Sequence, residues 1–169
     1  FLQESLNWTT KASSGTLVVV GIIAIIVQGG LIGPLVKQFG EMRLTLIGSG
    51  FILVACALLI TAPKENATIN IYSAVSFLAV GAGLITPTLR ALISKKLDID
   101  KQGSILSNLQ GLQSLGGVLG IAMAGRVYDS FGPKSPFIAG SVILLFMIYL
   151  IAEGKSNNSF NNQKSKVLK

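Results

Sequence analysis

The chain has 169 residues, of which 50% are hydrophobic and only 12% are charged, and its formal net charge is +7. Soluble domains carry about 25% charged residues, so this composition excludes an ordinary soluble domain and is typical of a membrane protein. The absence of histidine and the single cysteine, Cys56, exclude histidine-based triads, histidine metal sites and an internal disulfide. The basic residues lie in short patches between apolar runs, so the positive charge does not predict a nucleic-acid partner.

Five apolar segments follow one another along the chain, separated by short polar breaks. A helix that crosses the hydrocarbon core needs about 20 residues, and each segment has this length or nearly so. The predicted spans are residues 15–36, 44–61, 71–93, 104–127 and 136–152. The sequence therefore predicts an all-α fold, a polytopic helical membrane protein with five transmembrane helices.

A glycine-rich stretch, QGGLIGPLVKQFGEMR, occupies residues 28–43 at the end of the first span. It matches neither the Walker pattern nor the G-x-G-x-x-G dinucleotide pattern, and the apolar run before it is too long for a strand. Pro34 can kink or end the helix, and Gly40 permits a tight reversal before the next span. We therefore predict a helix end and a hairpin here rather than a phosphate loop.

The third span contains Pro87, a position expected to kink the helix or to serve its packing, and Arg90. An arginine at the bilayer centre costs about 2.5–3.5 kcal/mol on insertion scales. Arg90 lies near the end of the span, from which a long side chain reaches the lipid headgroups. The simplest interpretation of Arg90 is an anchor at the membrane interface.

The fourth span is rich in glycine, serine and glutamine, and polar residues inside membrane helices usually face the protein interior. With one amide of the first span, they give the candidate residues of a substrate cavity: Gln28, Asn108, Gln110, Gln113 and Ser114. Two interpretations stay open, because such amides either line a cavity or form interhelical hydrogen bonds worth about 0.6 kcal/mol each. The small residues of this helix predict close packing against another helix, at Gly111, Gly116 and Gly120.

The polar tail, residues 153–169, is rich in asparagine and lysine and is predicted to be disordered. Five crossings would divide the basic residues between two faces, with ten on one face and four on the other. The positive-inside rule places the larger group in the cytoplasm, so the tail is predicted to be cytoplasmic. The ten are Lys37, Arg43, Arg90, Lys95, Lys96, Lys101, Lys155, Lys164, Lys166 and Lys169, and the four are Lys11, Lys64, Arg126 and Lys134.

The stretch GGLIGPLVKQFGEMRLTLIGSG resembles the loop between the second and third helices of a half-domain in the major facilitator superfamily. The pattern of that loop is roughly G-x-L-x-D-R-x-G-R-[RK]. The matching residues are Gly33, Leu35, Lys37, Gly40 and Arg43, with Pro34 inserted. The acidic position of the pattern is Val36 here, which puts in doubt the gating role that the resemblance would otherwise imply.

A second stretch, residues 81–129, looks like the tenth and eleventh helices of drug/proton antiporters such as the tetracycline efflux proteins. The similarity lies in a G-x-G followed by Pro87, a charged loop ending in Gln102-Gly103, and a Gly/Ser-rich helix ending in Gly125 and Tyr128. Many relatives have Gly-Pro where this chain has Gly120-Ile121. The resemblance covers nearly all of residues 1–152.

The resemblance implies that the five spans are helices eight to twelve of a twelve-helix carrier, the C-terminal half, whose partner is a missing N-terminal half of helices one to seven. It implies secondary transport of an unknown small solute, most simply efflux by alternating access, in the plasma (inner) membrane. No enzyme activity and no cofactor are expected. All seven acids lie in loops or at span ends, so a group that couples transport to protons would lie in the missing half. The alternative is a non-transporting membrane subunit or a truncated remnant that only packs against other proteins.

The charge distribution generates a prediction about topology. Ser94→Cys and Asn66→Cys, each introduced after Cys56 is replaced, can be labelled in whole cells with a membrane-impermeant thiol reagent. Because the ten-to-four division places residue 94 inside and residue 66 outside, we expect labelling at position 66 and none at position 94. The reverse pattern would contradict the orientation.

Overall fold

The computed structural model describes the backbone of residues 10–61, 67–95 and 99–167, and the side chains of residues 14–61, 68–95 and 102–153. Every element in these ranges is helical, which confirms the predicted all-α fold. The helices are α2 (Thr10–Ile26), the π-helix η1 (Val27–Leu31), α3 (Ile32–Phe39), α4 (Glu41–Thr61), α5 (Ala67–Ser94), α6 (Ile99–Phe131) and α7 (Ser135–Val167).

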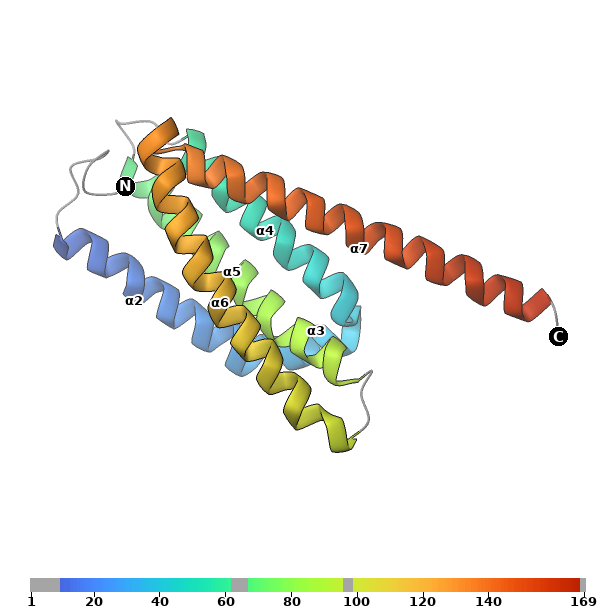
Figure 1. The fold of residues 1–169 in the computed structure, drawn as a ribbon. Helices are drawn as coiled ribbons and strands as arrows, with labels where there is room; N and C mark the ends of the chain where they lie inside the picture. The colour runs from blue at the N-terminus through green and yellow to red at the C-terminus, as the bar shows by residue number, and fades with distance from the viewer. Residues whose placement is uncertain (1–9, 62–66, 96–98, 168–169) are drawn as a thin grey trace.

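The long helices run in alternating directions along the bundle (Figure 1). The α3–α4 turn, the end of α5 and the start of α6 lie at one end, while α6 meets α7 at the other end. Among the described residues, four helices are long and apolar enough to cross a membrane: Ser14–Phe39, Glu41–Thr61, Thr68–Ser94 and Ser135–Glu153. The helix α6, which contains the predicted span 104–127, falls short of this criterion because glycine, serine and glutamine lower its hydropathy.

The helices α2, η1 and α3 form one continuous helix from Thr10 to Phe39, whose middle section, η1, is a π-helix. The N–H of Ile32 donates to the carbonyl of Val27, five residues earlier. Pro34 has no N–H for the carbonyl of Gly30, which lies within the π-helix, so a wider turn ahead of the proline relieves the clash that its ring would cause. The helix does not end at Pro34, as it could have, but at Gly40, where a φ of 76° makes the reversal into α4.

In the structure α7 continues as a helix to Val167 and projects beyond the bundle (Figure 1), over residues whose composition predicts a disordered tail. No proline interrupts residues 153–167, and their single glycine is Gly154. Once a helix is nucleated, each added residue contributes a further hydrogen bond, so the apolar first half of α7 can propagate into the polar second half.

Of the helices that the structure describes, α4 and α5 make the most extensive helix–helix contact, and their backbones approach closely. A Cβ on Gly48 would lie 3.0 Å from the carbonyl oxygen of Gly81, and a Cβ on Gly81 would lie 2.7 Å from the carbonyl oxygen of Gly48. Next to the crossing, the buried hydroxyls of Thr45 and Thr88 form an interhelical hydrogen bond of 3.1 Å. Such a short separation is possible only because neither glycine has a side chain.

The apolar core extends from this crossing to the continuous helix formed by α2, η1 and α3. Val27, Leu44 and Leu84 are buried together, one from each of η1, α4 and α5. Partly buried apolar side chains surround them, from Ile23, Ile32, Leu35, Val36, Phe51 and Val80. The π-helix therefore packs into the core through Val27, and this contact fixes the side of α5 that η1 faces.

The α4–α5 crossing generates a prediction about stability. Gly81→Ala places a methyl group against a backbone carbonyl, so the helices must separate, and overpacking of this kind costs about 1–3 kcal/mol. Gly50→Ala, on the partner helix α4, is the matched control because nothing lies within 4 Å of its Cβ position. Unfolding of the purified full-length protein in detergent should show a lower stability for Gly81→Ala only. Equal stability of the two variants would contradict the close crossing.

Candidate functional site

A polar cluster joins the C-terminal half of α5 to α6. The guanidinium of Arg90 donates to the side-chain oxygen of Gln110 and, at 3.3 Å, to that of Gln113. Residues three apart lie one turn from each other on the same helix face, so both amides can reach one guanidinium. We call Arg90, Gln110 and Gln113 the Arg90 cluster.

Cavities lie on both sides of the Arg90 cluster. One has a volume of about 290 Å³ and is bordered by Arg90, Ser94 and Gln110. The other, of about 270 Å³, is bordered by Arg90 and Gln113 and is otherwise lined mainly by apolar side chains: Ile85, Leu89, Ile93, Leu109 and Leu112. The charged group thus stands between two hollows, one of which is largely apolar.

Gln28 reaches the same side of α5 from the π-helix. Its Nε2 atom lies 3.8 Å from the position that a Cβ would take on Gly83. Gly83 precedes Arg90 by seven residues, which places the two on nearly the same helix face, about 10 Å apart along the axis. Gln28 is therefore aligned with the Arg90 cluster, two turns further along α5.

The structure does not bring all the predicted cavity residues together. The hydroxyl of Ser114 donates to the carbonyl of Gln110 within its own helix, at 3.0 Å. Asn108 is exposed and lies two residues before Gln110, which rotates it by about 200° to the other side of α6. Of the five candidates, Gln110 and Gln113 share a site, and Gln28 lies along the same face of α5. Ser114 bonds within its own helix, and Asn108 is directed elsewhere.

Arg90 is the site residue that the sequence interpretation missed. We expected an anchor at the membrane interface, but its guanidinium turns to α6. The available signal was the pair of amides one turn apart, in the helix that follows Arg90 after a short loop. Such a connection makes the two helices antiparallel neighbours, so the end of α5 must face the first half of α6.

The loop that resembles the superfamily pattern is held by an ion pair that the pattern does not contain. Val36, at the acidic position, packs against the core, while Glu41, five residues later, pairs with Lys95 at the end of α5. The Lys95 side chain is 68% exposed and that of Glu41 is 13% exposed. The ion pair links the start of α4 to the end of α5. Leu35 packs against the core, whereas exposed positions hold Gly33, Pro34, Lys37 and Arg43.

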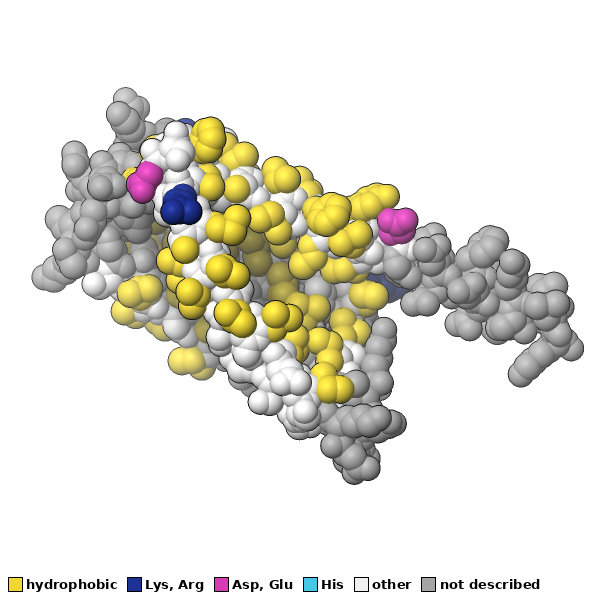
Figure 2. Space-filling view, in the orientation of Figure 1, with side chains coloured by type: hydrophobic (Ala, Val, Ile, Leu, Met, Phe, Trp, Pro, Cys, Tyr) yellow, Lys and Arg dark blue, Asp and Glu magenta, His cyan; other side chains and the backbone are white. Residues whose placement is uncertain are grey.

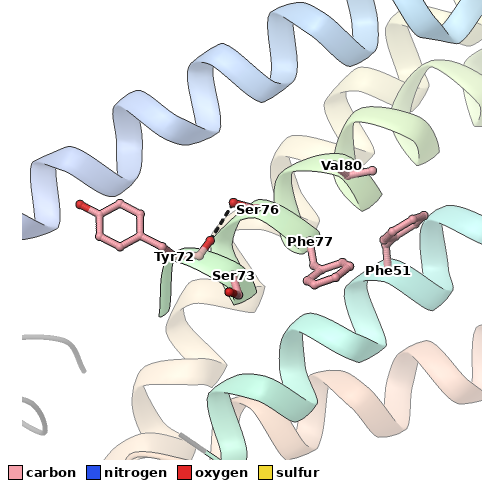
Figure 3. Close-up of a pocket in the computed structure, with 6 residues that line it drawn as sticks. All are labelled: Phe51, Tyr72, Ser73, Ser76, Phe77 and Val80. Carbon is pink, nitrogen blue, oxygen red and sulfur yellow. Dashed lines mark hydrogen bonds between the residues drawn. The ribbon is translucent and has the colours of Figure 1, made fainter. Parts of the chain in front are cut away.

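A third cavity, of about 390 Å³, lies in the N-terminal half of α5 (Figure 3). Phe51 of α4 and Phe77 of α5 stack beside it, with ring centroids 5.7 Å apart. The Tyr72 ring extends toward α2, where its hydroxyl oxygen lies 2.7 Å from the Cβ position of Gly15. This aromatic cavity lies on the opposite half of α5 from the Arg90 cluster, and no sequence pattern predicted it.

Hydrophobic side chains cover the face formed by α6 and α7 (Figure 2). Exposed apolar residues of these two helices include Leu115, Leu119, Val142 and Phe146, which are 59–62% exposed in the isolated chain. On α6, no described atom lies within 4 Å of a Cβ built at Gly111, Gly116 or Gly120. The packing predicted for these glycines has no counterpart among the described residues and stays a prediction.

Long apolar helices, a close glycine crossing and a charged cluster between cavities define a polytopic membrane protein. The chain matches the profile of the Major Facilitator Superfamily over residues 1–121. It therefore belongs to this superfamily, as the resemblance implied, and is an integral multi-pass membrane protein. The superfamily comprises transport proteins rather than enzymes.

Curated relatives are similar at low identity. The chain is 27% identical over 128 residues to the class C tetracycline resistance protein of Escherichia coli, covering 76% of this chain and 31% of the relative. It is 29% identical over 157 residues to the class G protein of Vibrio anguillarum, covering 88% and 38%. It is 24% identical over 131 residues to the human Hippocampus abundant transcript 1 protein, covering 78% and 26%. The chain thus spans about a third of these relatives. No solved structure gives a significant match.

The geometry of the Arg90 cluster generates a prediction about proximity. With Cys56 replaced, Arg90→Cys combined with Gln110→Cys should be joined efficiently by a short bifunctional thiol reagent, because the two side chains are in contact. Arg90→Cys combined with Asn108→Cys is the control, since residue 108 lies on the other side of α6. The yield of cross-linked protein, read after proteolytic cleavage in the α5–α6 loop, checks the expectation. Equal yields would contradict the observed orientation of α6.

Proposed function

We propose that this chain forms part of the C-terminal half of a secondary transporter that exports a small solute by alternating access. The observation that carries the proposal is the Arg90 cluster, which combines a cation and two amides from two helices of an apolar bundle. Transporters of this kind bind substrate near the bilayer midplane, between two repeats. In the proposed arrangement, α5 and α6 provide one wall of that path and the other half of the protein provides the opposite wall.

The direction of the Arg90 side chain supports a functional role for this cluster. An arginine costs about 2.5–3.5 kcal/mol at the bilayer centre on insertion scales, and less near the end of a span, where Arg90 lies. From there a long side chain can reach the lipid headgroups, but the guanidinium donates to Gln110 and Gln113 of α6 instead. Plain interhelical hydrogen bonding would return only about 0.6 kcal/mol per contact. A role in binding gives a reason for this direction.

The names of two relatives support export. Both bacterial relatives quoted above are tetracycline resistance proteins, and removal of a toxic compound from the cell is a direct route to resistance. We place the protein in the plasma (inner) membrane with the C-terminal end in the cytoplasm, on the basis of the division of basic residues. The described acidic side chains Glu41, Asp129 and Glu153 lie at the ends of the apolar segments or just beyond them. A proton-coupling group within the membrane would therefore be supplied by another part of the protein.

The proposed path generates a prediction about transport by the full-length protein. Gln110→Leu and Gln113→Leu each remove an amide while keeping a side chain of similar size. If both amides line the path, the initial rate per folded protein should fall, and by different factors for different solutes. If they only join helices, stability should change by no more than about 1 kcal/mol, and transport should follow the amount of folded protein.

Gly116→Leu provides the contrast for this measurement. If Gly116 packs against another helix, as its small-residue spacing predicts, a leucine should reduce the folded protein and lower transport of all solutes alike. Unchanged rates per folded protein in both glutamine variants would exclude the cavity role and favour a packing role for α6. Absence of transport for every solute tested with the unmodified protein would favour the alternative of a non-transporting membrane subunit.

A further inference from the structure

The chemistry of the Arg90 cluster restricts the kind of solute that it can recognise. We propose that the cluster binds an oxyanion, such as a carboxylate, sulfonate or enolate, on an organic solute with an apolar body. This inference rests on the proposed function, because it names the substrate class of the same path. It is carried by three observations on the described residues, concerning hydrogen-bond donors, charge and the shape of the cavities.

The cluster has spare donors and few spare acceptors. A guanidinium only donates hydrogen bonds, so the atoms of Gln110 and Gln113 that face Arg90 must be their carbonyl oxygens. Both amide NH₂ groups are consequently turned away from Arg90. Among the described residues, no acceptor receives a hydrogen bond from either NH₂ group. The NH₂ groups of the two amides and the remaining N–H groups of the guanidinium are therefore available to a ligand rich in acceptors.

The charge of the cluster is not balanced by the described part of the chain. Arginine stays protonated in proteins, and the partners of Arg90 are two neutral amides. Within the described residues, the recorded ion pair joins Lys95 and Glu41, and no carboxylate pairs with Arg90. An opposite charge stabilises a cation, and more strongly where bound solute excludes water. An anionic ligand would supply it, whereas a cationic ligand would be repelled.

The lining of the cavities indicates that the solute also has an apolar part. The cavity of about 270 Å³ runs from Arg90 and Gln113 along aliphatic side chains that include Leu89, Ile93, Leu109 and Leu112. A small inorganic anion would leave this surface uncovered. An organic anion would place its charged group on the guanidinium and its apolar body against the leucines, an arrangement typical of small-molecule sites. The headgroup of an anionic lipid presents similar chemistry, so the experiment must distinguish lipid from solute.

Three benzene derivatives of similar size separate charge from shape: benzenesulfonate, benzenesulfonamide and benzyltrimethylammonium. Thermal unfolding of the full-length protein in detergent reports binding, because a ligand that binds only the folded state raises the melting temperature. We expect stabilisation by the sulfonate and little or none by the neutral and cationic compounds. Because this comparison uses the unmodified protein, it remains informative even if a variant fails to fold.

Variants then assign the effect to Arg90. Arg90→Gln should weaken sulfonate binding by at least about tenfold, the loss expected for charge-assisted hydrogen bonds. Arg90→Lys keeps the charge but cannot reproduce the hydrogen bonds of the guanidinium to both amides. Its affinity for the sulfonate should therefore lie between those of the unmodified protein and of Arg90→Gln. Arg126→Gln, near the far end of α6, is the matched control because it removes one arginine outside the cluster, and its affinity should be unchanged. Equal stabilisation by all three compounds, or unchanged sulfonate binding in Arg90→Gln, would overturn the inference.

Two further measurements distinguish solute binding from lipid binding, and the oxyanion site from the proposed transport function. In one outcome, phosphatidylglycerol stabilises the protein more than phosphatidylcholine does, this difference is lost in Arg90→Gln, and the sulfonate has no effect. That outcome would show that the cluster binds a lipid headgroup and would overturn the proposal that it binds a solute. Uptake of labelled compounds into proteoliposomes tests the proposed function separately. Arg90-dependent binding without flux would support the oxyanion site and reject transport. Flux of the neutral or cationic compound that is insensitive to Arg90→Gln would support transport and reject the oxyanion site.

Discussion

The close crossing of α4 and α5 is the constraint on which the rest of the structure depends. Gly48 and Gly81 bring two backbones so near that an added Cβ would meet a carbonyl oxygen at 3.0 Å or less. Lipid tails are as apolar as leucine, so helices in a membrane associate through close packing and hydrogen bonds rather than through hydrophobic burial. The crossing fixes one side of α5 against α4. The opposite side is then available for η1 and α6, and it is there that Gln28 and Arg90 are found.

The two ends of α5 carry different chemistry. Toward its N-terminus, aromatic rings of Phe51, Tyr72 and Phe77 border an apolar cavity. Toward its C-terminus, Arg90 stands between two cavities and donates to two amides of α6. The π-helix lies between these regions and packs through Val27 against Gly83. Because π-turns recur at functional sites, its place beside the Arg90 cluster is consistent with the proposed path.

The exposed apolar face of α6 and α7 and the partial length of the chain bear on how the transport path is divided. The chain spans about a third of the length of the tetracycline resistance proteins that it matches. The polar cluster also has contributions from only two helices, α5 and α6. A transport path needs a second wall, so the proposed function assigns one side of the path to these helices and leaves the opposite side to the rest of the protein.

The sequence by itself determined the fold class, because a hydrophobic content of 50% and repeated apolar runs of membrane length permit little else than a helical bundle. It also indicated the superfamily, the reversal at Gly40 and the amides Gln110 and Gln113. Only the tertiary structure decided what those amides contact. The close crossing at Gly48 and Gly81 also appears only in the structure, since glycine spacing along a helix does not say which backbone approaches it. From the sequence alone Arg90 was interpreted as an anchor at the membrane interface. The sequence could not predict its contact with α6, because the direction of a long flexible side chain depends on the neighbouring helix.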